Sequence, residues 1–186
     1  MQELDKRTAY ILNTPIRQPS QMPTKIHTGE FDKEWENNIK DMWWYHKNNK
    51  IPVCAPHIKF DERMFDLRKK LLSFAGSEVC MPVVDGDLDN ILSRGQIWYG
   101  DRIQMRIGQQ SRCHENSSRL WKNNKDRYVL CTGYALTPDG MWRSHSWLVE
   151  PRTRKSRIIE TTVPRILYFG FAMSKEQAEE FIEMNL

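Results

Sequence analysis

The stretch MWRSHSWLVEPRTRKSRIIETT, residues 141–162, has apolar and β-branched residues on either side of a charged loop that contains Pro151. This pattern is typical of a β-hairpin. Centring the loop on EPRTRK predicts three cross-strand pairs, which are Val149 with Ser156, Trp147 with Ile158, and His145 with Glu160. Because side chains two residues apart on a strand share a face, we expect the histidine and the glutamate to lie opposite each other among apolar side chains.

The pairing of this histidine with this glutamate depends on the register. A slip of one residue would turn one of the two side chains to the other face of the hairpin. In the expected register the imidazole and the carboxylate lie within hydrogen-bonding reach, and a buried carboxylate requires such a partner. Two alternatives stay open: Glu160 could pair with Arg143 or Arg165, and His145 could be an ordinary core histidine.

The segments around this hairpin extend it into a larger sheet with a helix after it. RYVLCTGYALT before the hairpin and RILYFGFAM after it also have strand patterns, so the sequence predicts an antiparallel meander of about four strands. The last segment, SKEQAEEFIEMNL, places Ser174 and Gln177 at the spacing of a capping box, which predicts a C-terminal helix.

The N-terminal half is expected to be mostly helical. Residues 1–30 predict an irregular arm, residues 31–49 an amphipathic helix, and Asp61 caps a second helix that Gly76 ends. A short helix over 86–94, extended chain over 96–107 and a central helix over about 112–123 follow. The fold class is therefore α+β. The sequence predicts one domain, 1–186, with its arm at 1–30, a helical part at 31–107, and a catalytic helix and sheet at 108–186.

Composition favours a folded protein without a membrane segment. The 7 tryptophans favour a packed core over disorder, and 28 basic against 24 acidic residues give no strong indication of nucleic acid. No apolar run approaches the roughly 18 residues that a membrane-spanning helix needs. The N-terminus lacks the pattern of a signal peptide, and the four cysteines lack the pattern of a disulfide framework. We therefore expect a cytoplasmic protein with no membrane partner.

The stretch GQQSRCHENSSRLW, residues 108–121, places a cysteine where a polar loop becomes a helix. If Ser111 is the N-cap, Cys113 lies in the first turn, where free N–H groups and the helix dipole stabilise a thiolate. His145 is then the expected base, and Glu160 orients it. The backbone N–H of Cys113 is one expected oxyanion donor, and the side chain of Gln110, preferred over that of Gln109, is the other.

A glutamine-bearing loop, a cysteine that opens a helix, and then a histidine and an acidic residue on successive strands resemble the papain-like superfamily. The resemblance covers the order of elements over about 108–171, although this chain has SRCHENSS around the cysteine in place of the papain signature, and Glu160 in place of an asparagine. It implies a papain-like hydrolase with the triad Cys113, His145 and Glu160 that acts on a protein or peptide substrate and needs no cofactor or metal. Glutamine deamidases and transglutaminases of the same superfamily are a further alternative.

Several other residues carry weaker indications. His114 is adjacent to the thiol, but neighbouring helical residues point about 100° apart, which predicts a place at the rim of a cleft. Cys80 and Cys131 are expected in the core. Cys54 and His57 form a single Cys-x-x-His unit, which alone does not favour a zinc site.

The main rival function is a non-enzymatic binding module. The tip of the hairpin carries basic residues that could contact nucleic acid or an acidic protein, and these are Arg152, Arg154, Lys155 and Arg157. In that alternative Cys113 is incidental. A charged hairpin tip is more often simply solvated, so nucleic acid is not the favoured partner.

Overall fold

The structure is a computed structural model that describes residue 61 and residues 63–80, 85–151 and 156–186. Four features predicted from the sequence lie outside these residues: the arm over 1–30, the helix over 31–49, the Cys54–His57 unit and most of the basic hairpin tip. The single-domain organisation of residues 1–186 stays a prediction.

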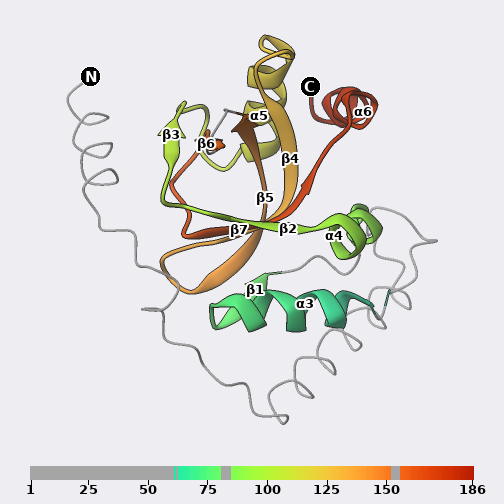
Figure 1. The fold of residues 1–186 in the computed structure, drawn as a ribbon, viewed down its shortest axis with the longest axis vertical. Helices are drawn as coiled ribbons and strands as arrows, with labels where there is room; N and C mark the ends of the chain where they lie inside the picture. Colours follow the sequence, from blue (N-terminus) through green and yellow to red (C-terminus); the bar gives the residue numbers. More distant parts are fainter. Residues whose placement is uncertain (1–60, 62, 81–84, 152–155) are drawn as a thin grey trace, which may run out of the picture.

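The described residues form a mixed α+β structure (Figure 1). Its helices are α3 (Arg63–Phe74), α4 (Leu88–Arg94), α5 (Cys113–Lys122) and α6 (Lys175–Asn185). Its strands are β1 (Glu78–Cys80), β2 (Gln96–Tyr99), β3 (Ile103–Met105), β4 (Val129–Leu136), β5 (Met141–Glu150), β6 (Arg157–Glu160) and β7 (Leu167–Ala172). Each of these helices and the four strands from β4 to β7 were predicted from the sequence.

The helix ends follow their expected capping residues. The Asp61 carboxylate accepts a hydrogen bond from the backbone N–H of Arg63 at 3.0 Å, and Gly76 follows α3 with a φ of +93° that a side chain would disfavour. At α6 the Ser174 hydroxyl accepts from the Gln177 N–H, and the Gln177 side chain accepts from the Ser174 N–H. This reciprocal pair is a capping box, as predicted.

The predicted meander is wrong in its last step. The strand order is β2-β7-β4-β5-β6-β3, with β1 paired in parallel to β5. The free edge of β6 is occupied by β3, which runs parallel to it, so β7 pairs instead with β4 and β2. Gly133 and Gly170 are paired where β4 meets β7, and a Cβ atom on Gly170 would lie 2.0 Å from the Thr132 carbonyl oxygen. The glycines therefore allow a backbone approach that the meander did not require.

The order of strands forces the sheet to curl. Its two edge strands, β2 and β3, are consecutive in the chain and are joined only by residues 100–102. A link of this length spans at most about 14 Å, so the two edges must come close together. The short turn was predicted from Gly100 and Asp101, but pairing of the two flanking strands to opposite edges of one sheet was not.

The curled sheet separates two apolar clusters. The helices cover its outer face, where Trp121, Leu136, Leu148 and Phe171 pack with α3, α4 and α6. The inner face holds a smaller cluster, formed by Cys131, Ala135, Trp147, Val149, Ile158 and Tyr168. Trp98 of β2 and Ile103 of β3 pack against this inner cluster, which is the interior of the curl. No helix in the described part of the chain is both long and apolar enough to cross a membrane.

Removal of the α6 cap should weaken the fold measurably. We expect Ser174→Ala to lower the free energy of unfolding by about 1 kcal/mol, because the N–H of Gln177 loses its acceptor. Ser174→Asp keeps a side-chain acceptor, and aspartate is about as favourable as serine at an N-cap, so this variant should retain near wild-type stability. Urea unfolding followed by circular dichroism measures both, and equal losses in the two variants would contradict a role for the cap.

Candidate active site

An interruption in strand pairing along one edge of β5 creates the site. β4 pairs with one edge of β5 from Trp142 to Val149. The other edge is paired with β1 at residues 141–143 and with β6 at residues 148–150. Between them, residues 144–147 have no strand partner on that edge. Buried backbone groups require hydrogen bonds, so another part of the chain must supply them here.

The first turns of α5 supply these hydrogen bonds. The Ser117 hydroxyl donates to the carbonyl oxygen of Ser146 at 3.1 Å, and the backbone N–H of Ser146 donates to the sulfur of Cys113. Ser117 and Ser118 are both fully buried. Small side chains on this face of the helix therefore let it approach the unpaired segment of β5 closely, as the sequence predicted.

The start of α5 differs slightly from the expected one. Its N-cap is Arg112 rather than Ser111, and no side chain caps the helix. Ser111 instead adopts a φ of +61°, a conformation that few residues other than glycine favour, and so turns the chain just before the helix. Cys113 is still within the first turn, where backbone N–H groups have no partner inside the helix.

The loop before Cys113 is held by a side chain of α5. The Asn116 amide accepts from the Gln109 N–H at 3.0 Å and donates to the Gln109 carbonyl oxygen at 2.7 Å. A Cβ atom on Gly108 would lie 2.4 Å from the Asn116 side chain, so a larger residue there would displace this amide. The Gln110 side chain is exposed and makes no hydrogen bond with the described residues. Its predicted role as an oxyanion donor therefore stays a prediction.

The structure brings His145 and Glu160 together, but in a register different from the predicted one. Val149 pairs with Ile158, not with Ser156, so the hairpin is shifted by two residues. A shift of two preserves the faces, and the two side chains become diagonal neighbours rather than directly opposed ones. The Nε2 atom of His145 lies 2.8 Å from Oε2 of Glu160, and both side chains are buried.

The Glu160 carboxylate is surrounded by hydrogen-bond donors. Oε1 accepts from the backbone N–H groups of Thr161 and Thr162, each at 2.8 Å, and from the Thr162 hydroxyl at 2.9 Å. Oε2 accepts from His145 and from the Tyr168 hydroxyl, the latter at 2.9 Å. An ionised carboxylate only accepts hydrogen bonds, so Nε2 of His145 must carry a proton. This leaves Nδ1 as the nitrogen that faces the hydrogen-bonded thiol of Cys113.

The three groups shift one another's pKa values. Burial alone would raise the pKa of the Cys113 thiol, but the hydrogen bond and positive charge of His145 lower it below its usual value. Burial opposes protonation of His145, yet the Glu160 carboxylate and the Cys113 sulfur raise its pKa to about 9. Burial likewise opposes ionisation of Glu160, and the charge of His145 lowers its pKa. The charged forms of the three groups thus stabilise one another, which favours transfer of the thiol proton to the imidazole.

The other residues considered from the sequence are not part of the group formed by Cys113, His145 and Glu160. His114 is half-buried and bonds the Ser146 hydroxyl through Nδ1 at 2.6 Å. Cys131 is buried, as predicted, whereas Cys80 is exposed, because β1 is short and places it outside both clusters.

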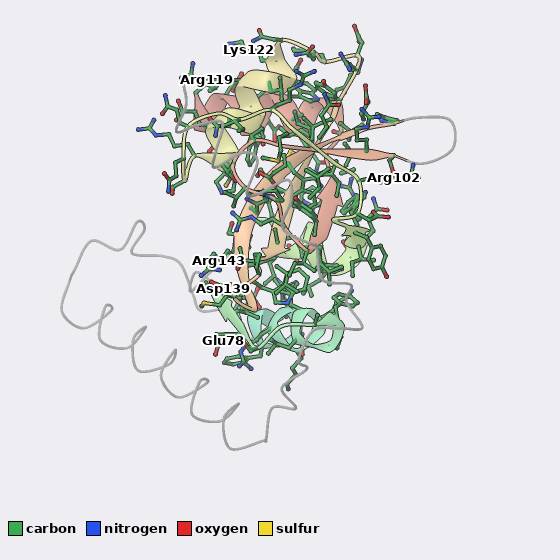
Figure 2. All side chains as sticks on the ribbon, turned by 90° about the vertical axis from the view of Figure 1, so that its left-hand side faces the viewer. Glu78, Arg102, Arg119, Lys122, Asp139 and Arg143 are labelled. Carbon is green, nitrogen blue, oxygen red and sulfur yellow. The ribbon has the colours of Figure 1, made fainter. Side chains whose placement is uncertain are left out.

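Arg143 pairs with Asp139 rather than with Glu160. Arg119 and Lys122 lie on the outer surface of α5, where they face away from the sheet (Figure 2).

Three residues that hold the site were not identified from the sequence. Tyr168 and Thr162 bond Glu160, and Asn116 holds the loop before Cys113. The IETT sequence at 159–162 carries a local indication, because a hydroxyl two residues after a carboxylate commonly bonds back to it. Tyr168 carries no such indication, because its contact depends on β7 crossing to β4.

No family model, curated protein or solved structure matches this chain in the comparisons with known proteins. The papain-like resemblance therefore remains a resemblance. What the chain can do must be inferred from the geometry of its own residues.

The pKa of Cys113 can be tested by its rate of alkylation. We expect iodoacetamide to label Cys113 with an apparent pKa below that of an ordinary thiol, because the hydrogen bond and charge of His145 stabilise the thiolate against burial. In His145→Ala the apparent pKa should rise to the ordinary range of about 8.5 or higher. Peptide-resolved mass spectrometry across pH separates Cys113 from Cys80 and the buried Cys131 in the same sample. Identical pH profiles of labelling for Cys113 and Cys80 would contradict an ion pair between Cys113 and His145.

The effect of Glu160 on the imidazole has its own readout. In Glu160→Gln we expect the pKa of His145 to fall below about 9, because one of the two groups that raise it against burial is lost and only the Cys113 sulfur of that pair remains. Nuclear magnetic resonance titration of the imidazole nitrogens measures this change. Glu150→Gln is the matched control, since Glu150 is a buried carboxylate of the same hairpin that pairs with Arg127. A His145 pKa near 9 in both variants would contradict the assignment.

Proposed function

We propose that this protein is a thiol-dependent hydrolase or acyl transferase that acts on an amide, isopeptide or ester bond. The observation that carries the proposal is the continuous hydrogen-bonded chain from Cys113 through His145 to Glu160. A thiol at a helix N-terminus, a base and a buried group that orients the base are the parts that nucleophilic catalysis by cysteine requires. The half-buried position of Cys113 leaves part of its side chain accessible to a substrate.

Each residue has a defined part in the proposed reaction. The Cys113 thiolate attacks the carbonyl carbon, and the backbone N–H of Cys113 is positioned to bind the oxyanion that forms. The C–N or C–O bond then breaks, and the leaving group takes the proton from Nδ1 of His145. Glu160 keeps the imidazole in the tautomer that directs Nδ1 at the thiol. The product of this half of the reaction is an acyl thioester on Cys113.

The second half of the reaction determines the class of enzyme. When water attacks the thioester, its proton passes to His145, and the carboxylic acid and the free thiol are released. When an amine attacks instead, the acyl group is transferred to it. A glutamine side chain as the first substrate would release ammonia, so deamidation and transglutamination use the same three residues. A protein or peptide substrate in the cytoplasm is our proposal for all three reactions.

Acylation of Cys113 by a small active ester tests the chemistry before any natural substrate is known. We expect p-nitrophenyl acetate to give a burst of nitrophenol and one acetyl group on Cys113, which hydroxylamine removes. Cys113→Ala should abolish the adduct, and His145→Ala should slow its formation by about 10²-fold or more. Cys80→Ala is the control, because that thiol is exposed and not part of the chain of hydrogen bonds. Equal acetylation of Cys80 and Cys113 would contradict the proposal.

The pH dependence of turnover follows from the two pKa shifts. Amide turnover should fall at acidic pH as the Cys113 thiolate is protonated, and again above about 9 as His145 loses the proton that the leaving amine needs. Alkylation of Cys113 needs only the thiolate and should persist above that pH. A peptide library assayed by mass spectrometry follows turnover, and a shift of about +1 Da on glutamine would identify deamidation rather than cleavage.

The binding-module alternative predicts a different outcome in the same experiments. It expects an interaction that weakens with added salt, that survives Cys113→Ala, and that leaves the thiol unreactive. Most of the basic tip lies outside the described residues, and Arg157 donates to the Gln104 side chain at 2.9 Å. No contact among the described residues favours this alternative over thiol chemistry.

A further inference from the structure

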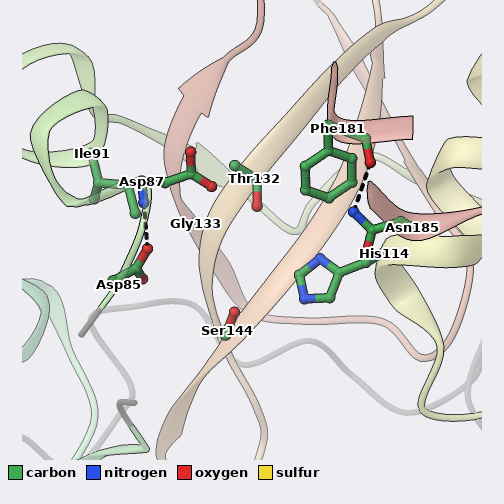
Figure 3. A pocket seen from close by; sticks show the side chains of 9 residues that line it. All are labelled: Asp85, Asp87, Ile91, His114, Thr132, Gly133, Ser144, Phe181 and Asn185. Carbon is green, nitrogen blue, oxygen red and sulfur yellow. Dashed lines mark hydrogen bonds between the residues drawn. The ribbon is translucent and has the colours of Figure 1, made fainter. Parts of the chain in front are cut away.

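A second site lies on the face of the β4–β5 pair opposite His145. It is a cavity of about 210 Å³. Its lining comes from the segment before α4 and from α4, α5, β4, β5 and α6, and includes Asp85, Asp87, Ile91, His114, Phe181 and Asn185. Figure 3 shows the two aspartates on one side of the hollow and His114, Phe181 and Asn185 on the other. Ser144 lines it and His145 does not, because neighbouring residues of a strand face opposite ways.

The acidic side of the cavity has unused hydrogen-bond acceptors. One oxygen of Asp85 accepts from the Tyr134 hydroxyl at 2.6 Å and the other from the Asp87 N–H at 2.9 Å. The Asp87 carboxylate accepts no hydrogen bond from the described residues. Burial, and secondarily the charge of Asp85, raise the pKa of Asp87. A positive group in the cavity would relieve both effects.

The opposite side of the cavity also presents acceptors. Nδ1 of His114 bonds Ser146, whose hydroxyl in turn donates to the Thr132 hydroxyl at 3.0 Å. Nδ1 therefore carries the ring proton, and Nε2 keeps a free lone pair. The Asn185 amide donates to the Phe181 carbonyl oxygen at 2.7 Å, which leaves its own oxygen free. No lysine or arginine is among the nine lining residues.

The size and lining of the cavity select the kind of guest. Its carboxylate, amide and imidazole acceptors suit a ligand that donates several hydrogen bonds and carries positive charge. Phe181 and Ile91 add an apolar wall, and an aromatic ring also attracts cations. A metal ion fits less well, because no group of three or more His, Cys, Asp or Glu residues in the described part of the chain could hold one.

We propose that this cavity binds a primary ammonium group on a short alkyl chain. The ammonium donates hydrogen bonds to Asp87 and Asp85, the alkyl chain packs on Ile91 and Phe181, and the acceptors of His114 and Asn185 line the opposite side of the cavity. A free alkylamine and a lysine side chain share this chemistry. The proposal does not rest on the function proposed for Cys113, since the cavity and the thiol lie on different faces of β5.

A titration of the full ¹⁵N-labelled chain with n-butylammonium chloride at constant ionic strength tests the proposal. We expect saturable shifts of the amide signals of Gly133, His114 and Asn185. n-Butanol, which has the same chain without the charge, and Mg²⁺ should cause no saturable shifts there. A lysine-containing peptide that binds more tightly than n-butylammonium would identify the source as a protein side chain, and weaker binding of the peptide would identify a free amine.

Two neighbouring aspartates, one at the N-cap of α4 and one in its first turn, give the matched comparison. Asp87→Asn should weaken n-butylammonium binding by about tenfold or more, which corresponds to about 1.4 kcal/mol. Asp89→Asn should leave binding unchanged, because Asp89 is exposed, pairs with Arg63 and does not line the cavity. Asn185→Ala is a second variant, expected to weaken binding several-fold, in case Asp87→Asn does not fold.

Three results would overturn the proposal. These are equal shifts with n-butanol and n-butylammonium, no shift with either, and an equal loss of binding in Asp87→Asn and Asp89→Asn. None of these results depends on catalytic activity. A failure here therefore leaves the proposed function of Cys113 untouched, and an unreactive thiol leaves this cavity untouched.

Discussion

The backbone of residues 144–147 on β5 is the constraint on which the site depends. One edge of this segment pairs with β4, and its other edge lies between the ends of β1 and β6. A buried strand edge must have hydrogen-bond partners, and the start of α5 provides them through Ser117 and the sulfur of Cys113. The same contacts that complete the sheet therefore bring the thiol to the strand that carries His145. The contact between α5 and residues 144–147 of β5 therefore both completes the hydrogen bonding of the strand edge and places Cys113 beside His145.

Much of this arrangement could be predicted from the sequence, because the decisive patterns are local. The capping residues of α3 and α6 are recognisable, and the strands from β4 to β7 are runs of apolar and β-branched residues separated by turn residues. The His145–Glu160 contact was predicted from a register that is wrong by two residues. The error left the contact intact because side-chain faces repeat every two residues, and because glutamate and histidine are long enough to meet diagonally.

The features that could not be predicted depend on contacts between distant segments. The parallel pairing of β3 with β6 displaces β7 to β4, and this places the Tyr168 hydroxyl on Glu160. No pattern within RILYFGFAM specifies that path. The Ser111 backbone and the Gly108–Asn116 contact are set by the packing of α5 on the sheet, so the predicted cap was one residue too early. Local sequence patterns identified the candidate residues Cys113, His145 and Glu160, whereas the order of the strands determined which residues hold them in place.

The two faces of β5 are coupled by charge as well as by position. Cys113 and His114 are consecutive in α5, and Ser146 contacts both, through its N–H and its hydroxyl. Burial, and next the positive charge of His145, lower the pKa of His114. The protonated state of His145 that stabilises the thiolate therefore also adds to the effect of burial in favouring the neutral form of His114. A neutral His114 retains the lone pair that faces the acidic cavity. The charge of His145 therefore acts on a residue of each face, while burial alone already favours the acceptor form of His114.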